Sequence, residues 1–303
     1  MTGAAGLALY DRAAARGSAQ VLESYSTSFR LATRLCGPSV RADLAAIYAL
    51  VRVADEVVDG CAADAGLSSP QCREVLDGLE REVEAALASG YSANLVVHAF
   101  ATTARATGIG TDLTRPFFAS MRRDLTPLAF TEERELDEYV YGSAEVVGLM
   151  CLASFRRGLR PDPVRDARWD RGAIALGSAF QRVNFLRDLG EDADGLGRRY
   201  FPGIDPHSFS DAQRDRILDG IDAELAIAQA VIGELPASSR RAVTAAHLLY
   251  SELSARLRRT PARELVERRV RVPASRKATL LARAALYGRT RAGRDRRAGG
   301  DPR

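Results

Sequence analysis

The stretch Gln181–Pro202, QRVNFLRDLGEDADGLGRRYFP, combines the end of an apolar helix with a basic loop. Within it, Asn184, Asp188 and Asp192 are spaced four residues apart, so on an α-helix they share one face, and Gln181 joins that face. Amide and carboxylate oxygens suit Mg²⁺, which typically takes one or two carboxylates together with substrate phosphates. The spacing therefore predicts a helix face that binds a metal ion and a phosphorylated ligand, although acids one turn apart are also common on solvated helices.

Three further residues, Arg198, Arg199 and Tyr200, follow directly after these acids. Guanidinium groups bind phosphate oxygens through paired hydrogen bonds. We therefore expect the arginines to hold the part of a phosphate group that a metal ion does not reach.

A second acidic pair occurs earlier, in RVADEVVDG at residues 52–60. Asp55 and Asp59 are again one helical turn apart, and Arg52 lies one turn before Asp55. Valines flank these acids on both sides, which a simply solvated helix face would rarely show. Two matched acidic pairs in one chain favour a functional role for both.

Like charges at this spacing should cost each helix about 0.2–0.5 kcal/mol. Replacing Asp55 or Asp188 with asparagine should therefore not lower the melting temperature of the ligand-free protein. Turnover should nevertheless fall, because these carboxylates are expected to serve the ligand.

Composition places the chain among ordinary globular proteins. It has 303 residues, enough for one large domain or two small ones, with 46% hydrophobic and 27% charged residues. A net charge of +4 is too small to indicate nucleic-acid binding. The four cysteines form no metal-binding or redox motif, which favours reduced thiols in the cytoplasm. The sequence predicts neither a signal peptide nor a membrane span.

Helical periodicity covers most of the chain, and no strand-like alternation or solenoid repeat is present. The sequence predicts one all-α domain at residues 1–288, with loops at 61–70, 158–172 and 193–209. The expected helices are at 3–28, 29–35, 39–60, 71–89, 95–108, 115–125, 132–150, 173–192, 211–235, 238–259 and 275–287.

Residues 289–303 are predicted to form a disordered basic tail. Five of its six arginines, Arg289, Arg291, Arg294, Arg296 and Arg297, lie close together in its first part. Near an anionic membrane surface each would contribute about 1 kcal/mol of attraction, giving peripheral association. The plainer interpretation is a solvated terminus.

Two glycines, Gly142 and Gly148, lie inside the helix expected at 132–150. Glycine costs a helix roughly 1 kcal/mol relative to alanine, so a steric reason is expected. These glycines indicate either close helix packing or room for a bulky ligand beside the helix.

Other catalytic patterns are missing from the sequence. The three histidines, His98, His207 and His247, are scattered and do not have metal-ligand spacing. No nucleophile elbow, P-loop or dinucleotide-binding glycine motif occurs.

Four stretches together resemble the squalene/phytoene synthase family, and most of all its bacterial phytoene synthases. They are TSFRLATRL (27–35), IYALVRVADEVVD (47–59), YVYGSAEVVG (139–148) and QRVNFLRDLGEDADGLGRRYFP (181–202). They occur in the family's order and at its spacings, and the resemblance extends from Ser26 to about Tyr287. It implies a single-domain helical bundle of the isoprenoid synthase type, with two aspartate motifs at the mouth of a central apolar cavity.

The resemblance also implies roles for individual residues. The implied metal ligands are Asp55, Asp59, Asn184, Asp188 and Asp192, and the four aspartates are the implied catalytic acids. The implied substrate-binding residues are Ser28, Arg52, Gln181, Asn184, Arg198, Arg199 and Tyr200. Tyr141 and the released diphosphate are candidates for the base that removes the final proton.

The sequence departs from the family pattern at three positions. Glu56 stands where the family often has a second aspartate, and Arg30 differs from the residues expected after Ser28. Glu145 stands where a small residue is expected, and a carboxylate inside a hydrocarbon tunnel would be costly. Glu145 must therefore either point elsewhere or shape the specificity of the pocket.

The implied activity is a Mg²⁺-dependent head-to-head condensation of two geranylgeranyl diphosphates to phytoene, in carotenoid biosynthesis. It proceeds through a cyclopropylcarbinyl diphosphate, needs no NADPH, and could also use Mn²⁺. The alternatives are a farnesyl diphosphate-using presqualene diphosphate, dehydrosqualene or squalene synthase, and a non-catalytic assembly factor. A terpene cyclase or head-to-tail prenyltransferase is disfavoured by RRYFP, and an assembly factor by the two intact acidic pairs. Substrate chain length and oligomeric state stay open.

Overall fold

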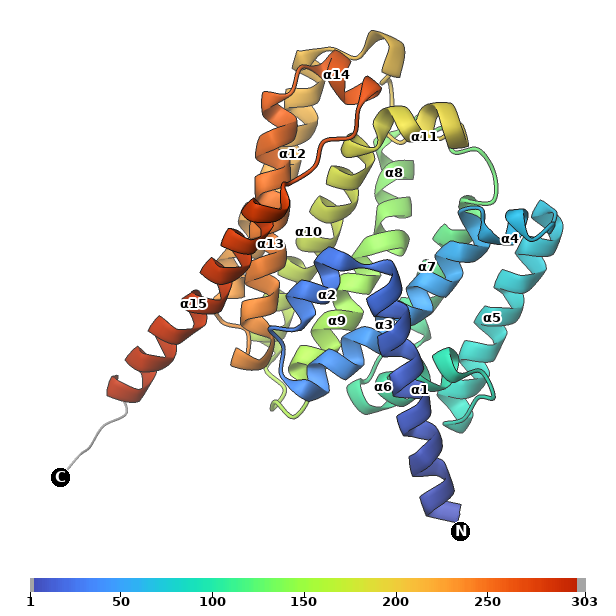
Figure 1. Ribbon diagram of the computed structural model, residues 1–303, viewed down its shortest axis with the longest axis vertical. Helices are drawn as coiled ribbons and strands as arrows, with labels where there is room; N and C mark the ends of the chain where they lie inside the picture. Colours follow the sequence, from blue (N-terminus) through green and yellow to red (C-terminus); the bar gives the residue numbers. More distant parts are fainter. Residues whose placement is uncertain (1–2, 299–303) are drawn as a thin grey trace.

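Helices make up all the regular structure in the described part of the chain (Figure 1). The computed structural model describes residues 3–298, apart from the side chains of residues 3–4, 27–28, 194, 196 and 287–298. The helices are α1 (Gly3–Tyr25), α2 (Thr27–Thr33), α3 (Pro38–Val58), α4 (Cys61–Asp64), α5 (Ser69–Ser89), α6 (Leu95–Thr107), α7 (Thr111–Arg123), α8 (Glu133–Val140), the π-helix η1 (Tyr141–Glu145), α9 (Val146–Arg156), α10 (Pro163–Arg187), α11 (Leu189–Leu196), the 3₁₀-helix η2 (Pro206–Ser208), α12 (Asp211–Ile232), α13 (Ala237–Arg259), α14 (Ala262–Glu267) and α15 (Ala274–Ala298).

Local sequence chemistry explains where several helices begin. The Asp162 side chain accepts hydrogen bonds from the backbone N–H groups of Val164 and Arg165 at 3.1 and 3.0 Å, and Pro163 occupies the first position of α10. Capping boxes stabilise the starts of α5 and α12 in the same way. Because of the Asp162 cap, α10 starts well before residue 173, and the loop predicted at 158–172 is much shorter than expected.

The helix predicted at 173–192 is also divided. Helix α10 ends at Arg187, Asp188 has φ −102° and ψ 10°, and α11 begins at Leu189. Asp188 and Asp192 therefore do not lie within one helix, although the N–H of Asp192 still donates to the carbonyl of Asp188 at 2.9 Å. Helix α11 occupies the beginning of the loop predicted at 193–209.

The C-terminal part of the chain also differs from the prediction. Helix α14 was not expected, and α15 continues to Ala298, so the predicted boundary at residue 288 does not coincide with the end of a helix. The backbone of residues 289–298 is helical where disorder was expected, and residues 299–303 lie outside the described part.

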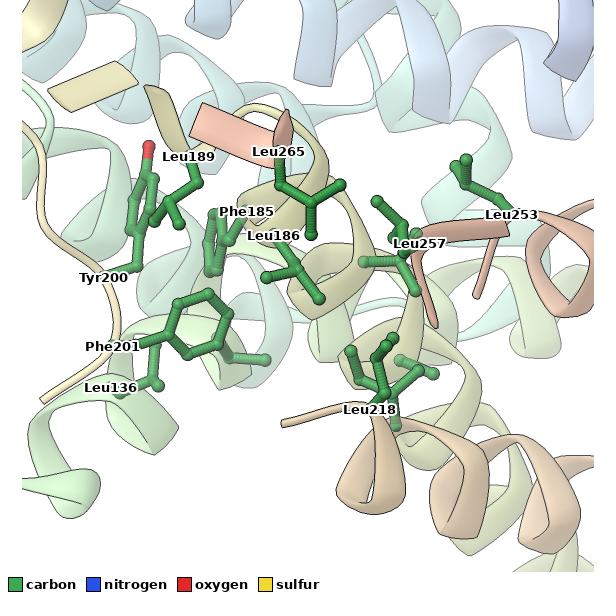
Figure 2. Packing of buried hydrophobic residues seen from close by; sticks show 14 of the residues in the cluster. Leu136, Phe185, Leu186, Leu189, Tyr200, Phe201, Leu218, Leu253, Leu257 and Leu265 are labelled. Carbon is green, nitrogen blue, oxygen red and sulfur yellow. The ribbon is translucent and has the colours of Figure 1, made fainter. Parts of the chain in front are cut away.

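Two apolar clusters hold the helices together. One joins α8, α10, α12, α13 and α14 with Tyr200 and Phe201, and the other joins α3, α5, α6, α7 and α9. Figure 2 shows part of the first cluster, in which Tyr200 and Phe201 lie beside Phe185 of α10. The rings of Tyr200 and Phe185 are stacked with centroids 3.7 Å apart. This stacking fixes the loop after α11 against α10.

An apolar cavity of about 420 Å³ lies within the bundle, lined by residues of α2, α3, η1, α9, α10, α12 and α13. The all-α fold and the central apolar cavity predicted from the sequence are thus both present. No helix within residues 3–298 is long and apolar enough to cross a bilayer.

The glycines at 142 and 148 serve close packing. A Cβ atom on Gly142 would collide with the Ser120 hydroxyl and the Pro116 carbonyl oxygen of α7. One on Gly148 would lie 2.8 Å from the Ala173 carbonyl oxygen of α10. Gly148 also lines the cavity, so at this position the backbones of α9 and α10 approach each other at the cavity wall.

Candidate active site

On both α3 and α10, the residues that line the cavity come first, and an acidic residue follows toward the C-terminal end of the helix. On α3, Val51 lines the cavity, and Asp55 follows one turn later. On α10, Asn184 lines the cavity, and Asp188 follows one turn later at the helix end. Both helices therefore carry an apolar wall that ends in a carboxylate, which gives the cavity an acidic mouth.

Arg198 connects the two acidic motifs across this mouth. Its Nη2 atom donates to Asp59 Oδ1 at 2.9 Å, and it interacts electrostatically with Asp192. The Arg198 side chain is only 8% exposed, and its Nη2 atom lies 3.9 Å from Oδ1 of the buried Asp124. The structure thus brings the motifs of α3 and α11 together around one guanidinium group.

Two carboxyl groups of the acidic motifs, those of Asp55 and Asp192, have raised pKa values. Burial, followed by the charge of Asp59, raises the pKa of the half-buried Asp55 to about 8. Burial and the charge of Asp188 raise the pKa of Asp192 to about 6. A bound cation would reverse both shifts, because it would favour the ionised carboxylates.

Asp188 has a different environment, since both of its oxygens are occupied by arginines. Arg187 forms a two-pronged ion pair with it, and Arg269 donates from Nε to Oδ1 at 2.8 Å and from Nη2 to Oδ2 at 3.1 Å. Arg269 comes from the segment between α14 and α15, far from Asp188 in the sequence. In this structure the charge of Asp188 is therefore compensated by protein cations.

The oxygen atoms at the mouth fit a divalent cation such as Mg²⁺. The side-chain oxygen of Asn184 is buried and has no hydrogen-bond partner, although it lies between the cavity and Asp188. In residues 3–298, no three His, Cys, Asp or Glu side chains converge closely enough to hold an ion by themselves. An ion here would need oxygens from a ligand as well, which is how Mg²⁺ usually binds phosphates.

Of the other predicted substrate-binding residues, Gln181, Tyr200 and Arg52 lie beside the cavity or beside acidic residues of the two motifs. Gln181 lines the cavity and donates to the Ser143 hydroxyl at 3.4 Å, and Tyr200 is buried beside Asp192. Arg52 pairs with Glu56, and its guanidinium group lies 4.6 Å from the ring centroid of Tyr25.

Arg199 does not join this arrangement. The Arg199 side chain is exposed, and its backbone N–H donates to the carbonyl of Leu128 at 2.7 Å. Arg199 therefore anchors the loop after α11, whereas Arg198 reaches the acids. The side chain of Ser28 lies outside the described residues.

The π-helix η1 explains the position of Glu145. Ser143 and Ala144 face the apolar cavity, whereas Tyr141 and Glu145 line a separate polar pocket of about 630 Å³ with Arg182 and other polar residues. Glu145 therefore points away from the apolar cavity. This is the first of the two possibilities that the sequence left open, the second being that Glu145 shapes the specificity of the pocket. Burial and the charge of Glu224 raise the pKa of Glu145 to about 7. The candidate base Tyr141 lies in this polar pocket as well, so its position does not support that role.

Two residues of the site, Asp124 and Arg269, carry little signal in the sequence. Asp124 accepts a hydrogen bond from the Tyr139 hydroxyl at 2.6 Å and faces Arg198, and its burial raises its pKa to about 7. Arg269 lies on a stretch rich in arginine, where sequence gives no reason to select one. Asp124 follows two arginines directly after α7, and that local charge pattern was the only signal.

Comparisons with known proteins show the family of the chain. Residues 22–276 match the family model described as squalene/phytoene synthase. The chain is 30% identical over 258 residues to a 15-cis-phytoene synthase from Paracoccus sp., covering 80% of this chain and 81% of that protein. It is 34% identical over 210 residues to a 15-cis-phytoene synthase from Synechocystis sp., covering 67% of this chain and 59% of that protein.

Solved structures show the same fold at lower identity. A dehydrosqualene synthase in complex with a ligand superposes with a TM-score of 0.72 at 21% identity, covering 92% of this chain and 98% of the other. A squalene synthase from Alicyclobacillus acidocaldarius superposes with a TM-score of 0.71 at 19% identity, covering 83% and 95%. The fold predicted from the sequence is thus confirmed, and the chain belongs to the squalene/phytoene synthase family.

Proposed function

We propose that the protein is a phytoene synthase-like prenyltransferase, which condenses two geranylgeranyl diphosphates head to head through a cyclopropylcarbinyl diphosphate. The observation that carries this proposal is the apolar cavity whose walls on α3 and α10 both end in carboxylates one turn beyond the last lining residue. Such a site matches a ligand with a long hydrocarbon chain and a diphosphate head. The phytoene synthases among its relatives support this choice of product.

The mouth of the cavity binds and orients the diphosphates. Arg198 is held between Asp59 and Asp124, so its charge is fixed in place before a substrate arrives. A pre-positioned cation of this kind stabilises the negative charge that develops on the departing diphosphate. Arg52, Gln181, Asn184 and Tyr200 are the remaining residues that we assign to substrate binding.

Asp55, Asp59, Asn184, Asp188 and Asp192 are the residues that would hold Mg²⁺ or Mn²⁺. When bound, the cation withdraws charge from the diphosphate and so promotes cleavage of the allylic C–O bond. The orphaned oxygen of Asn184 and the raised pKa of Asp55 support this assignment, because both groups would gain from a nearby cation.

The cavity wall protects the reactive carbocation from water. Its lining is dominated by aliphatic and aromatic residues such as Phe29, Val147 and Leu176. Glu145 is kept out of this space by η1, so no carboxylate of that helix is available to capture the cation. An apolar, closed surrounding directs the cation to the double bond of the second prenyl chain.

The test is to incubate the purified protein with Mg²⁺ and either geranylgeranyl or farnesyl diphosphate, without a reductant, and to identify the hydrocarbon product by mass spectrometry. We expect phytoene from geranylgeranyl diphosphate. Presqualene diphosphate or dehydrosqualene formed only from farnesyl diphosphate would replace the proposal with the farnesyl alternative. If no product forms although the protein binds a prenyl thiodiphosphate, the non-catalytic alternative is favoured.

A further inference from the structure

The end of the bundle opposite the acidic mouth carries a basic surface. It is formed by residues 156–171, which comprise the last residue of α9, the loop 157–162 and the first turns of α10, together with the starts of α3 and α13. The segment contains six arginines and three aspartates, and Arg34, Arg41, Arg240 and Arg241 lie on the adjoining elements. We refer to residues 156–171 and these four arginines as the basic end.

Four arginines of the basic end are paired with carboxylates: Arg156 with Asp166 and Asp170, Arg157 with Asp43, Arg165 with Asp166, and Arg168 with Glu234. Arg41 and Arg240 are held by backbone carbonyls instead. Arg41 donates from Nη2 to the backbone carbonyls of Arg34 and Cys36 at 3.0 and 3.1 Å, and Arg240 donates from Nε to the carbonyl of Leu235 at 2.8 Å. Because a carbonyl is neutral, these contacts fix the guanidinium groups without cancelling their charge. The surface therefore keeps a positive potential.

Two large apolar side chains project from the same surface. Leu159 is 40% exposed, and Val164 is 79% exposed, the highest value among the large exposed hydrophobic residues of the described chain. The Asp162 cap fixes the first turn of α10 and so holds Val164 at the surface. Exposed apolar residues beside basic residues are typical of surfaces that bind anionic membranes.

The basic end is also next to the deep end of the apolar cavity. Phe155 and Trp169 line the cavity there, and Trp169 is only 3% exposed. The guanidinium group of Arg165 lies over the Trp169 ring, 5.0 Å from its centroid. A single layer of side chains therefore separates the cavity from this surface.

Figure 1 shows that the terminal helices extend toward the same end of the molecule. Helix α10 rises from this end to α11, whereas α1 and α15 project below the bundle, away from α11 and α14. On α1, Leu7 and Leu9 are 49% and 53% exposed. The N-terminal part of α1 thus extends away from α11 and α14.

We propose that the basic end docks on an anionic lipid bilayer, with Leu159 and Val164 inserted among the head groups. The deep end of the cavity then faces the bilayer, and the acidic mouth faces away from it. Docking itself does not depend on the enzymatic activity. The further consequence, that a hydrocarbon product passes from the cavity into the bilayer through the Trp169 side, rests on the proposed function.

The test uses the full-length protein, without substrate, in co-sedimentation with vesicles at low ionic strength. We expect binding to phosphatidylglycerol-containing vesicles, weaker binding to pure phosphatidylcholine vesicles, and weaker binding as salt is raised. Val164→Ser should weaken binding to the anionic vesicles about tenfold, because burial of one valine side chain is lost. Val75→Ser is the matched control, since Val75 is 44% exposed on α5, outside the basic end, and should leave binding unchanged.

A fluorescence measurement locates the contact independently. The chain contains one tryptophan, the buried Trp169, so the emission of the wild-type protein with the same vesicles is subtracted as the baseline. Val164→Trp should shift its emission to the blue on addition of anionic vesicles, whereas Val75→Trp should not. Equal binding to both vesicle types, or no shift with Val164→Trp, would overturn the proposal.

Truncation after residue 288 separates the basic end from the C-terminal arginines. If the truncated protein binds anionic vesicles and remains sensitive to Val164→Ser, the basic end is the contact surface. If truncation abolishes binding and Val164→Ser has no effect, the C-terminal segment is the anchor and the proposal is wrong. Because binding is measured with lipid alone, an enzymatically inactive protein that still docks would contradict only the proposed function.

Discussion

Replacing Asp55 or Asp188 with asparagine should have opposite effects on the stability of the ligand-free protein. The sequence places the two residues in equivalent motifs and predicts that neither change lowers the melting temperature. In the structure, Asp55 is half-buried, its pKa is raised by burial and by the charges of Asp59, Asp124 and Glu56, and Arg52 opposes this shift. Asp188 instead is held by Arg187 and Arg269. Asp55→Asn should therefore stabilise the protein, and Asp188→Asn should destabilise it.

The magnitude for Asp55 follows from its pKa. A carboxyl group whose pKa rises from 3.8 to about 8 on folding opposes folding, once ionised, by up to about 6 kcal/mol. Partial access of water reduces this cost, so we expect Asp55→Asn to gain about 2–4 kcal/mol. For a chain of this size that corresponds to a rise in Tm of roughly 3–6 °C.

The dependence on pH identifies the cause. Because the folded state holds the Asp55 proton more tightly than the unfolded state, this carboxyl lowers wild-type stability progressively as the pH rises from about 4 to about 8. Asparagine does not titrate. The gain from Asp55→Asn should therefore be small near pH 4, grow with pH, and become constant above about pH 8.

Asp188→Asn should lose stability by about 1–3 kcal/mol, because it leaves two partly buried guanidinium groups without their carboxylate. Thermal melts of the wild type and both variants, from about pH 4 to pH 9, measure these differences. Both variants should lose turnover by orders of magnitude, which an assay with Mg²⁺ and geranylgeranyl diphosphate checks. A pH-independent effect of Asp55→Asn, or an unchanged Tm for Asp188→Asn, would refute the electrostatic reasoning.

Three further predictions concern packing, the polar pocket and the cofactor requirement. Gly142→Ala should destabilise the protein by about 3 kcal/mol or more in denaturant titrations, because its Cβ would collide with the Pro116 carbonyl, whereas Gly220→Ala on α12, with free space around it, should stabilise by up to about 1 kcal/mol. Glu145→Gln should raise Tm more at pH 8 than at pH 5, because the pKa of Glu145 is raised to about 7 and wild-type stability is lost as this carboxyl ionises. The substitution should leave the product unchanged. A new product would place Glu145 in the apolar cavity. Product should form without NADPH, and an absolute requirement for NADPH in the product assay would replace phytoene synthase with squalene synthase as the function.

The sequence was sufficient for the helical architecture because helical periodicity is a local signal. The helix leading to Asp55 and Asp59 and the apolar positions around both acidic pairs were recognisable from spacing, but the single helix predicted through Asp188 and Asp192 is divided into α10 and α11. Boundaries were predicted less well where a cap lay outside the expected pattern. Asp162 and Pro163 start α10 early, and the break at Asp188 has no clear signal in DLGEDADG.

The sequence identified most residues of the candidate site, but not which of them contact each other. The sequence identified Asp55, Asp59, Asp188 and Asp192 as acidic pairs, because each pair is local in the chain. It could not show that Arg198 rather than Arg199 turns toward them, because that choice depends on the bridge between Ala129 and Arg199. It also could not distinguish the environments of Asp55 and Asp188, which depend on Asp124 and Arg269 from distant parts of the chain.

The sequence by itself determined the all-α class, most of the helices, the two acidic motifs and the family resemblance, because these depend on residues close together along the chain. Only the tertiary structure decided which charges oppose each other, because electrostatic energies depend on distance and burial in space. It also decided that Glu145 leaves the cavity, since the π-helix at Tyr141–Glu145 turns its side chain toward Arg182 and Glu224. Asp55 and Asp188 each begin a pair of aspartates spaced one helical turn apart, so their sequence patterns are the same. Packing places Asp55 among other acidic residues and Asp188 between two arginines.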